Sequence, residues 1–460
     1  MSARGLLTVA VLLIAWPALT GCGGYANTSE AFRRSMAGGQ PGQALVAANT
    51  ALGVDDAKSL PKGRGPDTPL LLLERATILQ AMGEYELSAR DFQAADKNLE
   101  VLDFTSDTAG SIGKYLYSDD STVYKAPPHE KLLVNTLNML NYLVRGDLSG
   151  AKVEARRLTV NQKYYKDAEP DARGMMAFSS YLAGFTFEMA GDAQEAQRYY
   201  GDAQEAGGVP TLKRAARRLH TVAGVGDVRL KGVLNQTINI PEAMKKPSKK
   251  PGDVLIVVQT GMAPFKSPKR VPIGAAIVSA SQPGPGARLS RSEQRRANNF
   301  AAKGILKWVN YPQLKRYRSN LSSVNLSVDG KDVPGGRALD VQSRVVKEYQ
   351  RIEGTLLAAA ITRLLTRAVA GELTQAAASG KKKNSLAATL LGLAVEGALT
   401  AADTPDTRSW VTLPAQLYIA RKQLPPGKHT IRLKVRGQLR EAAVDLQPGG
   451  FAVVNFSDLR

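Results

Sequence analysis

The sequence contains one cysteine, Cys22, and its thiolate is the best nucleophile in its neighbourhood. A lone cysteine cannot form a disulfide within the chain, so packing must supply the stability of the fold. An apolar run from Gly5 to Trp16 follows the positive charge of Arg4, and it has the length of an export signal rather than of a transmembrane helix. Small or aliphatic residues come directly before the cysteine: Leu19, Thr20 and Gly21.

This arrangement resembles the lipobox of bacterial lipoproteins. The resemblance implies that residues 1–21 are a signal peptide and that Cys22 receives a diacylglyceryl group, with its new amine acylated after cleavage. Residues 22–27 would then form a lipidated tether. Each buried methylene contributes about 0.8 kcal/mol, so two or three acyl chains anchor a protein without a transmembrane helix. Gly23 follows the cysteine in place of an aspartate, which favours the periplasmic side of the outer membrane over the inner membrane.

Other residue types that commonly carry chemistry are scattered along the chain. His129, His220 and His429 lie on different segments without the spacing of metal ligands, so we expect no metal site. No G-x-S-x-G, Walker A or H-E-x-x-H motif is present. We therefore expect a protein that is not an enzyme and uses no cofactor. Carboxylates that are distant in sequence could still converge, which leaves open an envelope enzyme that acts on cell wall or lipid.

The charge of the chain indicates the kind of surface that it meets. Its 460 residues include 61 lysines and arginines against 41 acidic residues, a net charge of +20, which favours an anionic partner. An exported protein rarely meets nucleic acid, so we expect anionic lipid or an acidic envelope polymer instead. The length of the chain indicates two or three domains.

Residues 28–235 contain four copies of one helical pattern. Each copy has a glycine at a tight turn, a small residue five positions later and an aromatic or small residue four positions beyond that. The positions are Gly39, Ala44 and Ala48; Gly83, Ser88 and Phe92; Gly146, Ala151 and Ala155; and Gly191, Ala196 and Tyr200. This spacing resembles the tetratricopeptide repeat, in which small residues let two helices cross closely. Such repeats present a concave face to protein partners. An unrelated helical bundle is the alternative.

One long insertion interrupts these repeats and is a candidate for contact with a partner. Its tyrosines and neighbouring polar residues are Tyr117, Asp119, Asp120, Tyr124, His129 and Glu130. Long loops in compact domains are usually functional or disordered. A cap on the helical array is an equally good interpretation of the same residues.

A linker rich in proline and lysine, residues 236–252, separates the repeats from a C-terminal α+β domain, residues 253–460. Alternating apolar residues predict strands at six places: Val254–Gln259, Ile273–Ser279, Leu321–Val328, Pro414–Ala420, His429–Val435 and Phe451–Phe456. Helices are expected from Asp340 to about Leu373 and from Asn384 to Ala402. The order predicts helices packed on an antiparallel sheet.

The expected helical pair, residues 355–402, is rich in alanine and glycine and has two interpretations. It could insert into a membrane as part of a secretion or pore assembly. It could also be a buried core pair whose small residues allow close packing. The second helix is short for a membrane span and carries Glu396, which is costly in hydrocarbon, so we favour the core.

Residues 261–320 are strongly basic and contain interleaved aromatic residues. The candidates for contact with an anionic surface are Lys266, Lys269, Arg270, Arg295, Arg296, Lys315 and Arg316. In an envelope protein this composition suits anionic lipid or polymer. A solvated excursion on a basic protein is the alternative.

Three stretches, 117–157, 253–273 and 407–427, are similar to those of uncharacterised bacterial outer-membrane lipoproteins with tetratricopeptide-like repeats. The last stretch is the most specific, because Arg408 and Trp410 precede the strand after Pro414. The resemblance implies a companion of envelope-assembly lipoproteins. We therefore expect a lipid-anchored scaffold that binds protein partners through its helical repeats and assists envelope or peptidoglycan assembly.

Overall fold

The structure is a computed structural model that describes residues 25–63, 65–101, 124–168, 173–235, 250–282, 288–317, 324–378 and 405–460. Several predictions fall outside these ranges. They concern the signal peptide, Cys22, most of the linker, the second helix of the pair, and the loop residues Tyr117, Asp119 and Asp120.

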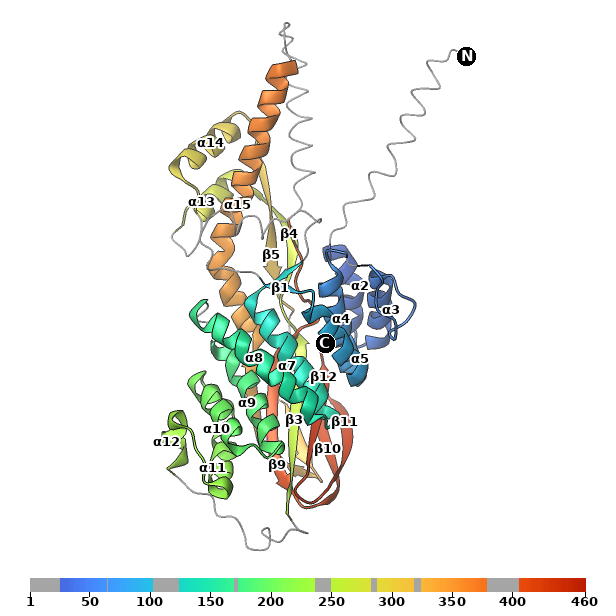
Figure 1. Ribbon diagram of the computed structural model, residues 1–460. Helices are drawn as coiled ribbons and strands as arrows, with labels where there is room; N and C mark the ends of the chain where they lie inside the picture. Colours follow the sequence, from blue (N-terminus) through green and yellow to red (C-terminus); the bar gives the residue numbers. More distant parts are fainter. Residues whose placement is uncertain are drawn as a thin grey trace, which may run out of the picture.

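The N-terminal half of the described chain is helical, as predicted. Its α-helices are α2 (Tyr25–Ala37), α3 (Pro41–Leu52), α4 (Thr68–Met82), α5 (Tyr85–Asp96), α7 (Pro128–Val144), α8 (Leu148–Ala168), α9 (Arg173–Met189), α10 (Ala193–Glu205), α11 (Leu212–Ala223) and α12 (Lys231–Leu234). Short strands β1 (Glu100–Val101) and β2 (Lys125–Ala126) pair in parallel between α5 and α7. Four hairpins dominate the packing: α2–α3, α4–α5, α7–α8 and α9–α10 (Figure 1).

Glycines lie at the turn of each hairpin. Gly39, Gly83, Gly146 and Gly191 have φ angles of 72°, 85°, 73° and 84°, a left-handed conformation that glycine adopts without steric cost. The small residues five positions later, which include Ser88, are fully buried. The hydroxyl of Ser88 donates to a carbonyl of α4 at 2.7 Å, so the two helices of that hairpin approach closely.

The C-terminal region contains two four-stranded sheets. One has the order β12-β3-β9-β8 and the other β11-β10-β6-β7. Their strands are β3 (Gly252–Met262), β6 (Asn325–Val328), β7 (Lys331–Asp332), β8 (Gly335–Asp340), β9 (Pro414–Leu424), β10 (Gly427–Val435), β11 (Gln438–Leu446) and β12 (Phe451–Asp458). All their pairs are antiparallel except β3–β12, which is parallel.

Strand β3 lies at the centre of three layers, and all of its residues are buried. Val254 and Ile256 join an apolar cluster between the two sheets. Leu255 and Val257, which point the other way, join a cluster that includes the helical hairpins. Helices therefore cover one face of the first sheet, and the second sheet covers the other. The hydrophobic core is continuous across the expected boundary between repeat domain and α+β domain.

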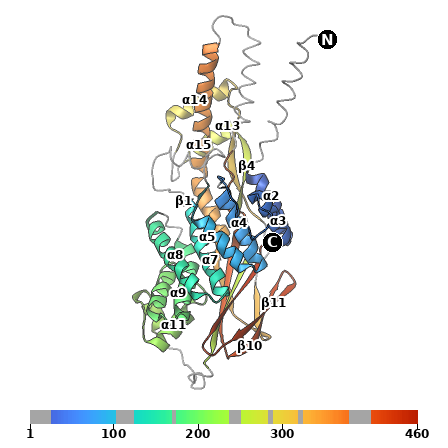
Figure 2. The same cartoon turned by 45° about the vertical axis from the view of Figure 1, so that its right-hand side comes forward.

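A third part of the molecule, which we call the arm, comprises described residues within 265–317 together with α15 (Val341–Ala378). Strands β4 (Phe265–Pro272) and β5 (Trp308–Lys315) form an antiparallel ribbon beside α13 (Ile273–Ala280) and α14 (Arg291–Ala302). These elements and α15 enclose an apolar cluster of their own. The arm extends away from the sheets and beyond α2 (Figures 1 and 2).

The structure corrects some of the predicted elements. Residues 273–279, predicted as a strand, belong to helix α13, because a short apolar run does not by itself distinguish the two. The single antiparallel sheet is in fact two sheets and a separate ribbon. The first helix of the expected pair is present as α15.

Candidate functional site

A segment without regular structure, residues 406–413, packs against helices α4, α5 and α7 through buried contacts. The indole of Trp410 is 1% exposed, donates from Nε1 to the hydroxyl of Thr77 at 2.9 Å, and meets the ring of Phe92 edge-on at 5.8 Å. Arg408 binds Asp406 and Asp67 at 2.8 and 3.2 Å. This segment of the chain itself, residues 406–413, therefore occupies the space between α4, α5 and α7.

Glu74 of α4 receives this segment with its carboxylate. Its oxygens accept the backbone N–H groups of Val411 and Thr412 at 2.7 and 2.9 Å, and the hydroxyl of Tyr25 at 2.6 Å. Burial raises the pKa of Glu74 to about 7, although these hydrogen bonds oppose the shift. The titratable carboxylate of Glu74 thus links α2, α4 and the segment 406–413.

A second buried polar cluster joins the helical layer to the first sheet. Arg421 of β9 binds both Asp253 and Glu188 at 2.8 Å, and Arg218 binds the same two carboxylates. Burial would raise the pKa of Asp253, but the charges of the two arginines lower it. The hydroxyl of Tyr200 also contacts Glu188 and Arg421. Each charge is matched inside the protein, so the cluster is a structural joint.

The described residues of the expected contact loop also join parts of the fold to one another. Tyr124 is buried and donates to Glu130 at 2.6 Å, and Glu130 accepts the backbone N–H of Trp410 at 3.1 Å. His129 pairs with Glu348 of α15 at 2.7 Å. These three residues hold the chain's own segments together, which corrects their assignment to a partner surface.

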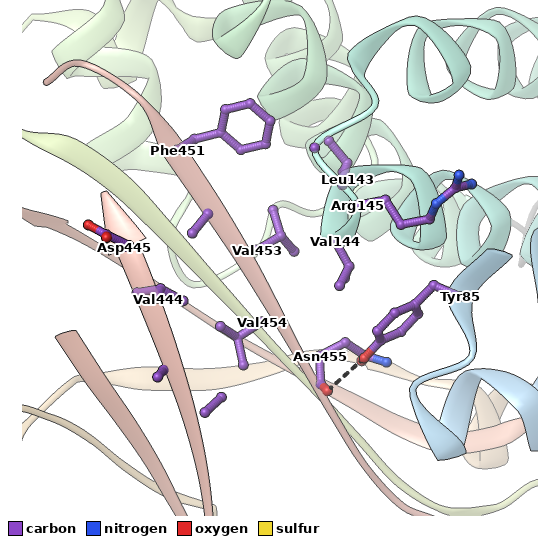
Figure 3. Close-up of a pocket in the computed structure, with 14 residues that line it drawn as sticks. Tyr85, Leu143, Val144, Arg145, Val444, Asp445, Phe451, Val453, Val454 and Asn455 are labelled. Carbon is purple, nitrogen blue, oxygen red and sulfur yellow. Dashed lines mark hydrogen bonds between the residues drawn. The ribbon is translucent and has the colours of Figure 1, made fainter. Parts of the chain in front are cut away.

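An open groove of about 470 Å³ lies between strands of both sheets and the ends of two helical hairpins (Figure 3). Two edge strands, β11 and β12, form two of its sides. Turns of the helical hairpins form the rest, through Tyr85 of α5 and residues 143–146 at the end of α7. We call this the strand-edge groove. Residues far apart in the sequence form it, so no local pattern could have predicted it.

Peptide groups of β12 point into the groove. The carbonyls of Asn455 and Ser457 accept side-chain hydrogen bonds from Tyr85 and Arg440, on the edge away from β3. Because peptide direction alternates along a strand, the peptide groups of Phe451 and Val453 face this same edge. The groove therefore presents backbone donors and acceptors beside apolar side chains.

Strand β11 lies on the opposite side, and its outer edge pairs with no other strand in the part of the chain that the structure describes. Its turn with β10 has positive φ at Arg436 and Gly437, and Val435 pairs with Gln438 directly beside it. In such a two-residue turn the flanking pair is hydrogen-bonded, so even-numbered residues of β11 bond to β10. The peptide groups of Ala443 and Asp445 consequently face the groove.

The arm carries most of the expected basic residues at its surface. Exposed are Lys269, Arg270, Arg295, Arg296, Lys315 and Arg316. Lys266 differs, because it is half-buried and its ammonium donates to the carbonyl of Arg408 at 3.2 Å. Trp308, at the far end of the ribbon, is 43% exposed.

Within the described ranges, no cluster of three or more histidine, cysteine or acidic side chains could hold a metal ion. His129, His220 and His429 lie on separate elements, each with its own hydrogen-bond partner. No helix among the described residues combines the length and apolar character needed to cross a membrane. Comparisons with protein-family models, curated proteins and solved structures find no match to the chain. The strand-edge groove and the arm are therefore the two surfaces from which a function can be argued.

Proposed function

We propose that this protein is a lipid-anchored envelope scaffold that holds an extended segment of a protein partner in the strand-edge groove. The observation that carries the proposal is the pair of strand edges, β11 and β12, which have no further strand beside them among the described residues and face a common space. An extended peptide that enters this space forms main-chain hydrogen bonds with either edge. Apolar side chains such as Val444 and Val453 would select alternate residues of the guest.

The helical hairpins support the same function. We assign them as tetratricopeptide-like repeats on the basis of their buried small residues and of Gly184. A Cβ atom at Gly184 would lie 2.5 Å from the ring of Tyr200, so only glycine lets α9 and α10 pack this closely. In this proposal the partner meets the repeats at their turns, through Tyr85 and Arg145, because the chain's own sheet covers their inner face.

The test places a photo-crosslinking amino acid at Asp445, on the rim of the groove, in cells that make the full-length protein. A control carries the same amino acid at Val46, which is 66% exposed on α3. We expect an adduct only from position 445, and mass spectrometry should map it to an extended segment of one envelope protein. Equal adducts from both positions would refute the proposal.

A blocking variant sharpens this experiment. Ala443→Pro removes a donor from the groove edge and leaves the β10 ladder intact. The one lost hydrogen bond, of about 0.5–1.5 kcal/mol, predicts an adduct yield that is roughly twofold to tenfold lower. Leu439→Pro is the matched control, because it has the same orientation on β11 but lies outside the groove lining.

The anchor is tested separately. We expect the mature protein to begin at Cys22 and to carry acyl chains on it. Intact-mass measurement of protein extracted from membranes checks this, and a retained leader would contradict it.

A further inference from the structure

The arm differs from the rest of the molecule in its charge. Described residues 265–282, 288–317 and 341–378 contain 16 lysines and arginines and four acidic residues. Its own core is apolar and includes Ile277, Phe300 and Leu364. A surface with so large an excess of one sign attracts a polyanion.

The arm begins beside the start of the mature chain. On α2, Arg33 places its guanidinium 3.8 Å from the ring centroid of Phe265 in β4 and donates to the hydroxyl of Tyr317 at 2.9 Å. Tyr25, the first residue of α2, is buried with its hydroxyl on Glu74. Because Cys22 is only three residues from Tyr25, an acyl anchor there lies within about 10 Å of this fixed point.

The length of the arm then constrains its orientation. The eight-residue ribbon spans about 26 Å, and the arm extends beyond α2 in both views (Figures 1 and 2). The anchor is close to the root of the arm, and the sheets lie on the opposite side of α2 (Figures 1 and 2), so the arm either lies along the bilayer or enters it. Entry would place many charged side chains in hydrocarbon, which is strongly unfavourable.

We propose that the arm lies along the anionic lipid headgroups beside the anchor, an inference that rests on the proposed lipidation of Cys22. Each lysine or arginine near such a surface raises membrane affinity about fivefold. A lipid anchor combined with a basic surface gives firmer attachment than either one alone. Trp308 suits the headgroup region, where an amphipathic ring has one polar and one apolar contact.

Tryptophan fluorescence tests this arrangement directly. The chain has three tryptophans; Trp16 lies in the expected leader, Trp410 is 1% exposed, and Trp308 is 43% exposed at the far end of the ribbon. Lipidated mature protein is reconstituted into vesicles of phosphatidylcholine alone or mixed with phosphatidylglycerol, with bromine on the upper acyl chains as a quencher. Trp308→Phe identifies the contribution of this one residue.

We expect quenching of Trp308 in the phosphatidylglycerol vesicles and at least twofold less in phosphatidylcholine. Changing Lys269, Arg270, Arg295 and Arg296 to glutamine should abolish this difference. The matched control changes Arg156, Lys213, Arg214 and Lys231, all exposed on the helical hairpins and α11–α12, to glutamine with the same loss of charge. It should retain the difference.

Equal quenching in the two vesicle types, or equal effects of the two variants, would overturn the proposal. A shift of Trp308 emission with soluble polyglutamate but not with vesicles would also overturn it, because the arm would then bind an acidic polymer. An absence of acylation at Cys22 would be recognised separately, because it changes the intact mass of the protein. An unacylated chain with a sound arm would still be quenched in phosphatidylglycerol vesicles alone.

Discussion

The helical region and the arm differ in the balance between their basic and acidic residues. The described residues from 25 to 235 contain 23 lysines and arginines and 20 acidic residues, a near balance that lets charges pair within the fold. Arg421 of β9 is 6% exposed and reaches two carboxylates where the sheet meets this region. The arm has 16 basic residues for four acidic ones, so its own carboxylates cannot balance most of its positive charge.

The difference distinguishes buried charges that are paired within the fold from exposed charges that lie among others of the same sign. A buried arginine whose partners are also buried contributes to cohesion, and its removal leaves carboxylates unpaired. An exposed arginine among other arginines contributes repulsion, so its benefit must come from outside the chain. Stability measurements on matched variants test this distinction.

The largest effect is expected from Arg421→Ala. This change leaves Arg218 alone with two buried carboxylates, and breaking such a network costs about 3–5 kcal/mol of unfolding free energy. Denaturant titration measures the loss. Arg432→Ala is the control, because its pair with Glu441 is about half exposed and should cost less than about 1 kcal/mol. Similar losses for the two variants would show that the buried network stabilises the fold no more than the exposed pair does.

Glu74, in the other buried polar cluster, makes the stability of the fold depend on pH. Its pKa is about 7 in the folded state against 4.5 ordinarily, so the folded protein binds this proton more tightly. The stabilisation is complete below pH 4.5 and is lost as the pH rises through 7, by about 3 kcal/mol. Unfolding free energy measured from pH 4 to 8 should show this fall, and Glu74→Gln should remove it. Parallel profiles for the two proteins would contradict the assignment.

Gly184→Ala tests the close packing of α9 against α10 beside the Arg421 cluster. The added methyl would meet the ring of Tyr200, whose hydroxyl contacts Glu188 and Arg421, so we expect a loss of about 1–3 kcal/mol. Gly42→Ala in α3 has open space around the new Cβ and should stabilise by up to about 1 kcal/mol. Thermal unfolding of both variants distinguishes crowding from helix propensity. Equal shifts would show that Tyr200 moves aside.

Local patterns in the sequence predicted local structure well. Glycines such as Gly83 and Gly191 lie at hairpin turns because positive φ is a local requirement. Alternating apolar residues predicted β3 and β12, where one face of each strand meets the sheet opposite. Residues 273–279 were predicted incorrectly because a short apolar run fits a helix or a strand equally well.

Local sequence patterns could not predict contacts between residues that are far apart in the sequence. Asp253 and Arg421 are 168 positions apart, and no periodicity connects them. Trp410 was notable only through a family resemblance, and its indole proves to be an interior contact with Thr77. The strand-edge groove combines α5, α7, β11 and β12, so only the folded topology reveals it.

The smallest effect on stability should come from the arm, and its sign is informative. Arg291 and Arg295 lie four positions apart at the start of α14, where like charges repel and the positive end of the helix dipole opposes them. Changing both to glutamine should therefore raise the unfolding free energy by a few tenths of a kcal/mol, up to about 0.5. Glu30→Gln in α2 breaks a pair with Arg34 at 2.5 Å and should lower it by a similar amount. Opposite signs in the two helices would show that the arm holds its charge at a cost to its own stability. A loss above about 1 kcal/mol from the arginine variant would mean that these charges are matched inside the chain, and the case for an external anion would fail.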